Sequence, residues 1–131
     1  MGGYGEGDVT LVNVRHSFEK STKVERLVLD LSRGTSGKGV ERPGFFHIAI
    51  QKNPPRVVID LQNVTRSKVN EQQVTTVLRK AHFFSKALFY EDQRSKDLTI
   101  ELPMKSRAKI EVFELVVPGK PGRIVLDTKA L

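Results

Sequence analysis

The sequence predicts a mostly β fold: a sandwich of two pseudo-symmetric four-stranded sheets from an internal duplication, with one short linking helix. A repeated six-residue pattern is the first observation, because internal repetition constrains architecture more than any single motif. In each copy apolar residues alternate across two faces, as in a half-buried strand. Clusters of Pro and Gly between such runs mark tight turns and are the second observation. The four copies read RLVLDL (26–31), RVVIDL (56–61), DLTIEL (97–102) and RIVLDT (123–128).

The duplication extends upstream of these strands. A gapless match places residues 12–31 on residues 83–102. Each half therefore contains four strands, and evenly spaced short strands favour a sandwich over a parallel α/β sheet. Apolar residues also stand 10, 8 and 6 positions before both Arg56 and Arg123, at Phe46, Ile48 and Ile50 and at Phe113, Leu115 and Val117.

The chain of 131 residues is long enough for one domain with a sizeable core. Residues 1–8 are rich in glycine, so we expect them to be disordered or added by cloning. The rest forms a single domain over 9–131. It divides into half one (9–64), a linker (65–82) and half two (83–131).

The linker contains the signals of a short helix. Asn70 followed by Gln73 matches a capping box, and Val69 and Val74 are spaced as a hydrophobic staple. The adjacent Thr75 and Thr76 are β-branched, so the segment 70–81 is either helix or strand, and we predict helix. One helical face would carry Val74, Val77, Leu78 and Ala81.

Each patterned strand has an apolar face and a charged face. Period-two geometry puts Leu27, Leu29 and Leu31 on one side, with Arg26 and Asp30 on the other. We expect the apolar faces to interdigitate as the core and the charged residues to be solvent-exposed. The core would then include Leu27, Leu29, Leu31, Val57, Ile59 and Leu61.

Composition bounds the class of protein. The formal net charge is +7 with no cysteine, which excludes disulfides and thiol catalysis. An excess of cations favours polyanionic partners or serves solubility, and composition does not choose between them. The sequence has no long apolar run and no secretory signal, so we expect no membrane insertion and either a cytosolic chain or a mature fragment. A monomer is expected.

Motifs for catalysis are absent from the sequence. Its three histidines lack metal-ligand spacing, and no serine lies in a nucleophile elbow. The glycine-rich segment 34–39 has Gly39 after Lys38 where a phosphate-binding loop needs Ser or Thr. We therefore predict a protein that is not an enzyme and that uses no cofactor and no metal.

The Arg and Asp of the repeat have two interpretations. In the first interpretation, they form cross-strand ion pairs that contribute a few tenths of a kcal/mol each to stability. Alternatively they form a recognition surface, since the guanidinium fork suits carboxylates and Asp suits hydroxyls or amides. The candidate ligand-binding residues share one strand phase: Arg26, Asp30, Arg56, Asp60, Arg123 and Asp127.

The arrangement resembles the AMIN domain, a module of bacterial cell-envelope proteins. The resemblance is carried by VERLVLDL (24–31), FHIAI (46–50), NPPRVVIDL (53–61) and PGRIVLD (121–127), and it covers about residues 9–131. The third copy of the repeat departs from the family pattern, since it begins with Asp97 instead of Arg.

The resemblance implies two packed pseudo-symmetric sheets and a function. AMIN domains precede peptidoglycan amidases and secretins of type IV pilus systems, where they act as targeting modules that bind the cell wall. The expectation is therefore a non-catalytic, periplasmic module that binds peptidoglycan through its outer sheet faces and belongs to a larger amidase or secretin. The alternatives are a protein-docking domain of an envelope complex and, with less support, a nucleic-acid-binding domain.

Overall fold

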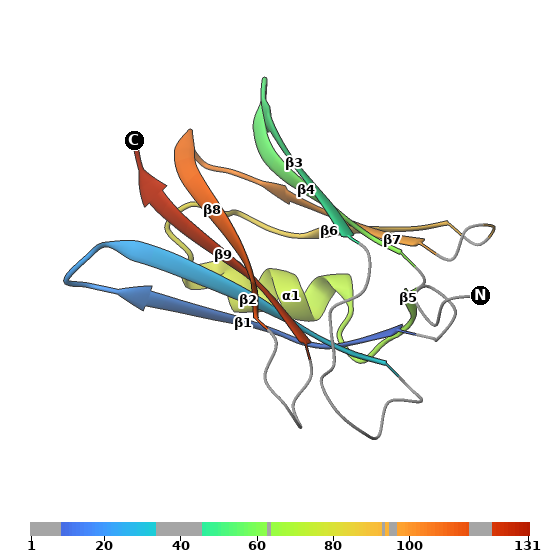
Figure 1. Cartoon of the computed structure of the whole chain (residues 1–131). Helices are drawn as coiled ribbons and strands as arrows, with labels where there is room; N and C mark the ends of the chain where they lie inside the picture. The colour runs from blue at the N-terminus through green and yellow to red at the C-terminus, as the bar shows by residue number, and fades with distance from the viewer. Residues whose placement is uncertain (1–8, 34–45, 63, 93, 95–96, 116–121) are drawn as a thin grey trace.

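Strands dominate the computed structural model, which describes residues 9–33, 46–62, 64–92, 94, 97–115 and 122–131 (Figure 1). Within these residues one α-helix, α1 (Glu71–Val77), runs into a short 3-10 turn, η1 (Leu78–Lys80). The strands are β1 (Val9–Glu19), β2 (Val24–Arg33), β3 (Phe46–Lys52), β4 (Pro55–Leu61), β5 (Val64–Ser67), β6 (Leu88–Asp92), β7 (Asp97–Pro103), β8 (Ala108–Leu115) and β9 (Gly122–Ala130). The N-terminal segment 1–8 and the glycine-rich segment 34–39 lie outside the described residues.

The strands form two sheets, which confirms the predicted sandwich. One sheet has the order β5-β1-β2-β9-β8 and the other β3-β4-β7-β6. Neighbours are antiparallel except β5, which runs parallel to β1. Each sheet contains one hairpin from each half of the sequence. The five-stranded sheet contains β1-β2 and β8-β9, and the four-stranded sheet contains β3-β4 and β6-β7.

One strand was not predicted. β5 lies at the start of the linker and adds a fifth strand to one sheet, so the described strands number nine instead of eight. Its four residues, VTRS, follow β4 closely and give little alternation to detect. Its place at the sheet edge is fixed by pairing with β1 and by the Lys68 N–H, which donates to the Leu11 carbonyl at 2.8 Å.

The apolar faces of the repeat form the core, as predicted. Leu27, Leu29 and Leu31 of β2 are at most 1% exposed, and so are Val57, Ile59 and Leu61 of β4. Burying a large aliphatic side chain contributes about 1.5–3 kcal/mol. The alternation of the repeat therefore decides which way each sheet faces. The other two copies complete the core with Leu98, Ile100, Leu102, Ile124 and Leu126.

The linker helix closes one side of the sandwich. Asn70 and Gln73 form the predicted capping box, each side chain bonding the other's backbone N–H at 2.8 Å. Residues 71–77 are α-helical, which settles the choice between helix and strand, and Val74 and Leu78 are buried in the core. Glu71 accepts the Phe89 N–H of β6 at 2.8 Å, so the helix also covers part of that edge.

The register differs between the two central strand pairs. In β2 and β9, which carry copies one and four, Arg26 lies opposite Asp127 and Asp30 opposite Arg123. In β4 and β7, which carry copies two and three, Arg56 lies opposite Pro103, two positions beyond Glu101. An offset of two residues keeps every side chain on its own face. It changes only which charges meet.

Candidate binding face on the five-stranded sheet

Three cross-strand rows build the outer face of the five-stranded sheet. The central row runs Arg15, Val28, Val125 and Phe113 over β1, β2, β9 and β8. The pseudo-twofold axis of the duplication passes between the two valines, because Arg26–Asp127 and Asp30–Arg123 lie symmetrically around them. The flanking rows read Ser17, Arg26, Asp127, Glu111 and Asn13, Asp30, Arg123, Leu115.

Asp30 is held between two arginines. Arg15 donates Nε to Oδ2 at 2.9 Å and Nη2 to Oδ1 at 3.1 Å, while Arg123 donates Nε to Oδ1 at 3.2 Å. The residue is 7% exposed, so the expected exposure of this carboxylate was wrong. The two guanidinium groups cover it, and their charged hydrogen bonds offset the cost of its burial.

Arg26 and Asp127 form the second pair. The contact is bidentate, with both N···O distances at 2.8 Å, and the Arg26 side chain remains 51% exposed. The hydrogen bonds to Asp127 raise the pKa of the Arg26 guanidinium above its ordinary value. Because the pKa of this cation is raised, its ion pair with Asp127 stabilises the folded state at every pH below the ordinary pKa of arginine. This stabilisation is lost only as the pH rises through the raised pKa.

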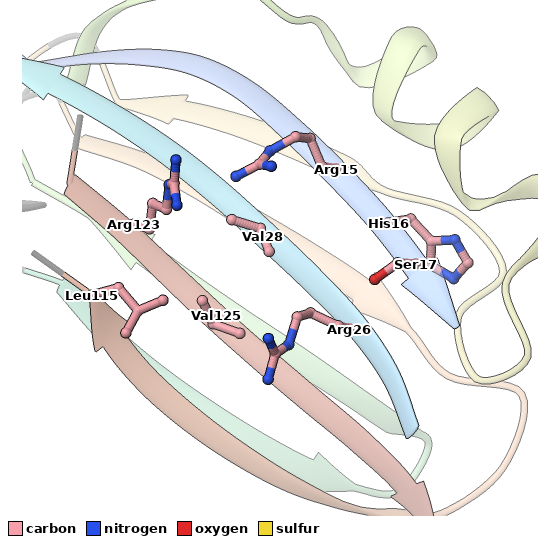
Figure 2. Close-up of a pocket in the computed structure, with 8 residues that line it drawn as sticks. All are labelled: Arg15, His16, Ser17, Arg26, Val28, Leu115, Arg123 and Val125. Atoms are coloured by element: carbon pink, nitrogen blue, oxygen red, sulfur yellow. The ribbon is translucent and has the colours of Figure 1, made fainter. Parts of the chain in front are cut away.

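An open hollow of about 360 Å³ lies among these rows. Figure 2 shows Arg15 and Arg123 on either side of Val28, with Arg26 beyond Val125 at the other end. The lining includes these three arginines and no described carboxylate. Each guanidinium has five N–H donors, and each already donates to a carboxylate: Arg15 and Arg123 to Asp30, and Arg26 to Asp127. With three guanidinium groups in its lining, the hollow suits a carboxylate.

The two remaining predicted residues lie on the opposite face of the sandwich. Asp60 of β4 accepts a hydrogen bond from Thr99 Oγ1 at 2.6 Å and has His47 Nδ1 at 3.9 Å. Arg56 has no carboxylate opposite it, and its buried Nε has no partner among the described residues. The six predicted residues thus form two groups. Arg26, Asp30, Arg123 and Asp127 lie on one face, and Arg56 and Asp60 on the other.

A second row of side chains crosses the outer face of the four-stranded sheet. His47, Asp60, Thr99 and Tyr90 stand side by side on β3, β4, β7 and β6. Tyr90 is 53% exposed, and the His47 side chain is 74% exposed. The outward position of His47 follows from its strand phase, whereas this alignment across four strands depends on register.

Sequence reasoning missed Arg15. The residue lies on the strand before the first repeat copy and faces Val28, from where it reaches diagonally to Asp30. The sequence signal that could have identified Arg15 is a cation at an outward-facing position of the strand that precedes the first repeat copy. A bulge between Leu11 and Asn13 shifts that register, and it is not visible in the sequence.

A buried glutamate on the inner side was also missed. Glu25 is 0% exposed and accepts the backbone N–H groups of His82 at 2.6 Å and Phe83 at 2.9 Å. His16 Nε2 lies 2.7 Å from the same carboxylate, and the His82 ring packs on Phe18 at 3.9 Å between centroids. This cluster ties the chain after η1 to β2, so we assign it a structural role.

The described residues hold no group of three or more His, Cys, Asp or Glu side chains placed to bind a metal ion. None of their helices has the length and apolar character needed to cross a membrane.

The chain matches no protein-family model, and no curated protein is similar to it.

Proposed function

We propose that this chain is a non-catalytic, periplasmic targeting module that binds peptidoglycan through its outer sheet faces. The hollow lined by Arg15, Arg26 and Arg123 is the observation that carries the proposal. The similarity of the repeat to AMIN domains supports it independently. The same similarity supports membership of a larger amidase or secretin.

The two faces suit different parts of an acidic glycopeptide. Peptide carboxylates match the arginine-lined hollow. Val28 and Val125 form an apolar floor between the arginines, against which aliphatic groups of a peptide would pack.

The four-stranded face offers acceptors and an exposed ring. Asp60 accepts one hydrogen bond from Thr99 and keeps lone pairs for sugar hydroxyls. Tyr90, two strands away in the same row, presents an aromatic surface for stacking. A glycan strand laid across this row would contact both groups.

Retention on purified sacculi tests the proposal. We expect Arg123→Gln to lower the affinity about tenfold or more, because a hydrogen bond to a charged group contributes about 1.5–3 kcal/mol. Arg79→Gln is the matched control, since Arg79 is exposed on η1, outside both sheets. Equal retention of wild type, Arg123→Gln and the double variant Arg26→Gln/Arg123→Gln would contradict the proposal.

A protein-docking domain is the second candidate. Exposed apolar side chains on the edge strand β8, Phe113 and Leu115 among them, favour it. It predicts retention on envelope protein complexes and no retention on bare sacculi, so the same pull-down separates the two functions.

A further inference from the structure

Edge strand β8 carries an unusual amount of exposed apolar surface. Val112, Phe113 and Leu115 are 38%, 39% and 42% exposed, and they make up half of the large exposed hydrophobic residues among those described. An edge strand of this kind invites pairing with another strand. The eight residues of β8 pair with β9 on one side, and the sheet order ends at β8 on the other.

Two like-charge pairs lie on the same strand. Lys109 stands directly opposite Lys129 of β9, and Glu111 directly opposite Asp127. Like charges placed opposite each other destabilise a sheet. Asp127 is neutralised by Arg26, but Lys109 and Glu111 form no ion pair with any described residue. On its outer phase β8 therefore carries Lys109 and Glu111, a cation and an anion two residues apart that have no opposite-charge partner among the described residues.

We propose that β8 pairs antiparallel with β8 of a second copy of this chain, centred on Ile110. In this register Lys109 of each copy lies opposite Glu111 of the other, which gives two symmetric opposite-charge pairs. Centring on Lys109 or on Glu111 instead would place like charges face to face. Val112 would lie opposite Ala108 of the second copy and lose part of its exposure to water.

The dimer joins two sheets into one continuous sheet. Because the twofold axis stands perpendicular to it, both outer faces point the same way. Two arginine-lined hollows then lie on one surface, and binding of a repetitive polymer would gain from effective concentration. Dimer formation itself does not depend on the proposed function, so either can fail alone.

Sedimentation equilibrium at low ionic strength tests the dimer, from about 10 to about 500 µM protein. We expect wild type to dimerise, and Lys109→Glu or Glu111→Lys to weaken the dimer at least about tenfold, because each creates two like-charge contacts. The double variant Lys109→Glu/Glu111→Lys restores wild-type affinity, and an equimolar mixture of the two single variants forms a heterodimer.

Matched controls use the other edge strands. Lys52→Glu on β3 and Glu91→Lys on β6 make the same charge changes at exposed positions of the four-stranded sheet, and they leave the dimer unchanged. A wild type that stays monomeric throughout the concentration range overturns the proposal. So does a dimer that survives both single charge reversals.

The register has its own test, because the chain has no cysteine of its own. Residues directly opposite across an antiparallel pair have Cβ atoms about 4.5–5.5 Å apart, near the distance a disulfide needs. Ile110→Cys therefore cross-links the two copies on oxidation. Val112→Cys does not, because in this register Val112 of one copy lies four residues away from Val112 of the other. Cross-linking of Val112→Cys alone would overturn the register.

Discussion

The two outer faces of the sandwich are built from the same repeat but differ in chemistry. On the five-stranded sheet, copies one and four bring Arg26 opposite Asp127 and Arg123 opposite Asp30, and both pairs form. On the four-stranded sheet, copies two and three are offset by two residues, so Asp60 meets Thr99 and Arg56 meets Pro103. One face becomes a set of ion pairs beside an arginine-lined hollow. The other becomes a row of separate polar groups.

The difference shows that register decides which charges pair within a repeat. Strand alternation is kept under either register, because the offset is even, and the core is equally well filled. Charge pairing changes completely. A duplicated sequence can therefore retain one fold while its two faces acquire different charge patterns, and the following predictions test this contrast.

The largest expected effect compares two aspartates. Asp30→Asn should lower the free energy of unfolding by about 2–3 kcal/mol, because it leaves Arg15 and Arg123 around a nearly buried neutral group. The matched Asp60→Asn should cost about 0.5 kcal/mol, since the Asp60 side chain is 45% exposed. Urea denaturation measures both. Equal losses would show that the two faces are electrostatically alike.

An intermediate effect is expected at Thr99. Thr99→Val removes the 2.6 Å hydrogen bond to Asp60 while it keeps the side-chain shape, and should cost about 1 kcal/mol. The double variant Thr99→Val/Asp60→Asn closes a mutant cycle for this pair. Additive losses in that cycle would mean that the row across the four-stranded sheet is not coupled.

The smallest effect comes from adding an ion pair to the four-stranded face. Val58 lies directly opposite Glu101 on its outer side, so Val58→Arg should be more stable than Val58→Glu by about 0.5–1 kcal/mol. The difference should shrink at high salt. A salt-independent result, or greater stability of the Glu variant, would place β4 and β7 in another register.

Much of the fold was predictable from local sequence. The alternation in Leu27–Leu29–Leu31 and Val57–Ile59–Leu61 identified both inner faces, and the Asn70–Gln73 capping box identified the helix. β5 escaped because a four-residue strand has too few alternations to stand out from a loop. The buried state of Asp30 escaped because it depends on Arg15, which approaches from a different strand.

By itself the sequence determined the duplicated strands, the buried side of each sheet and the residue types available on the outer faces. Those features follow from side-chain periodicity, which is local. Only the tertiary structure decided that each sheet contains one hairpin from each half, that Arg26 meets Asp127 while Arg56 meets Pro103, and that three arginines gather beside one hollow. Strand order and register are set by contacts between segments far apart in the chain, and an even shift of register leaves the hydrophobic pattern unchanged.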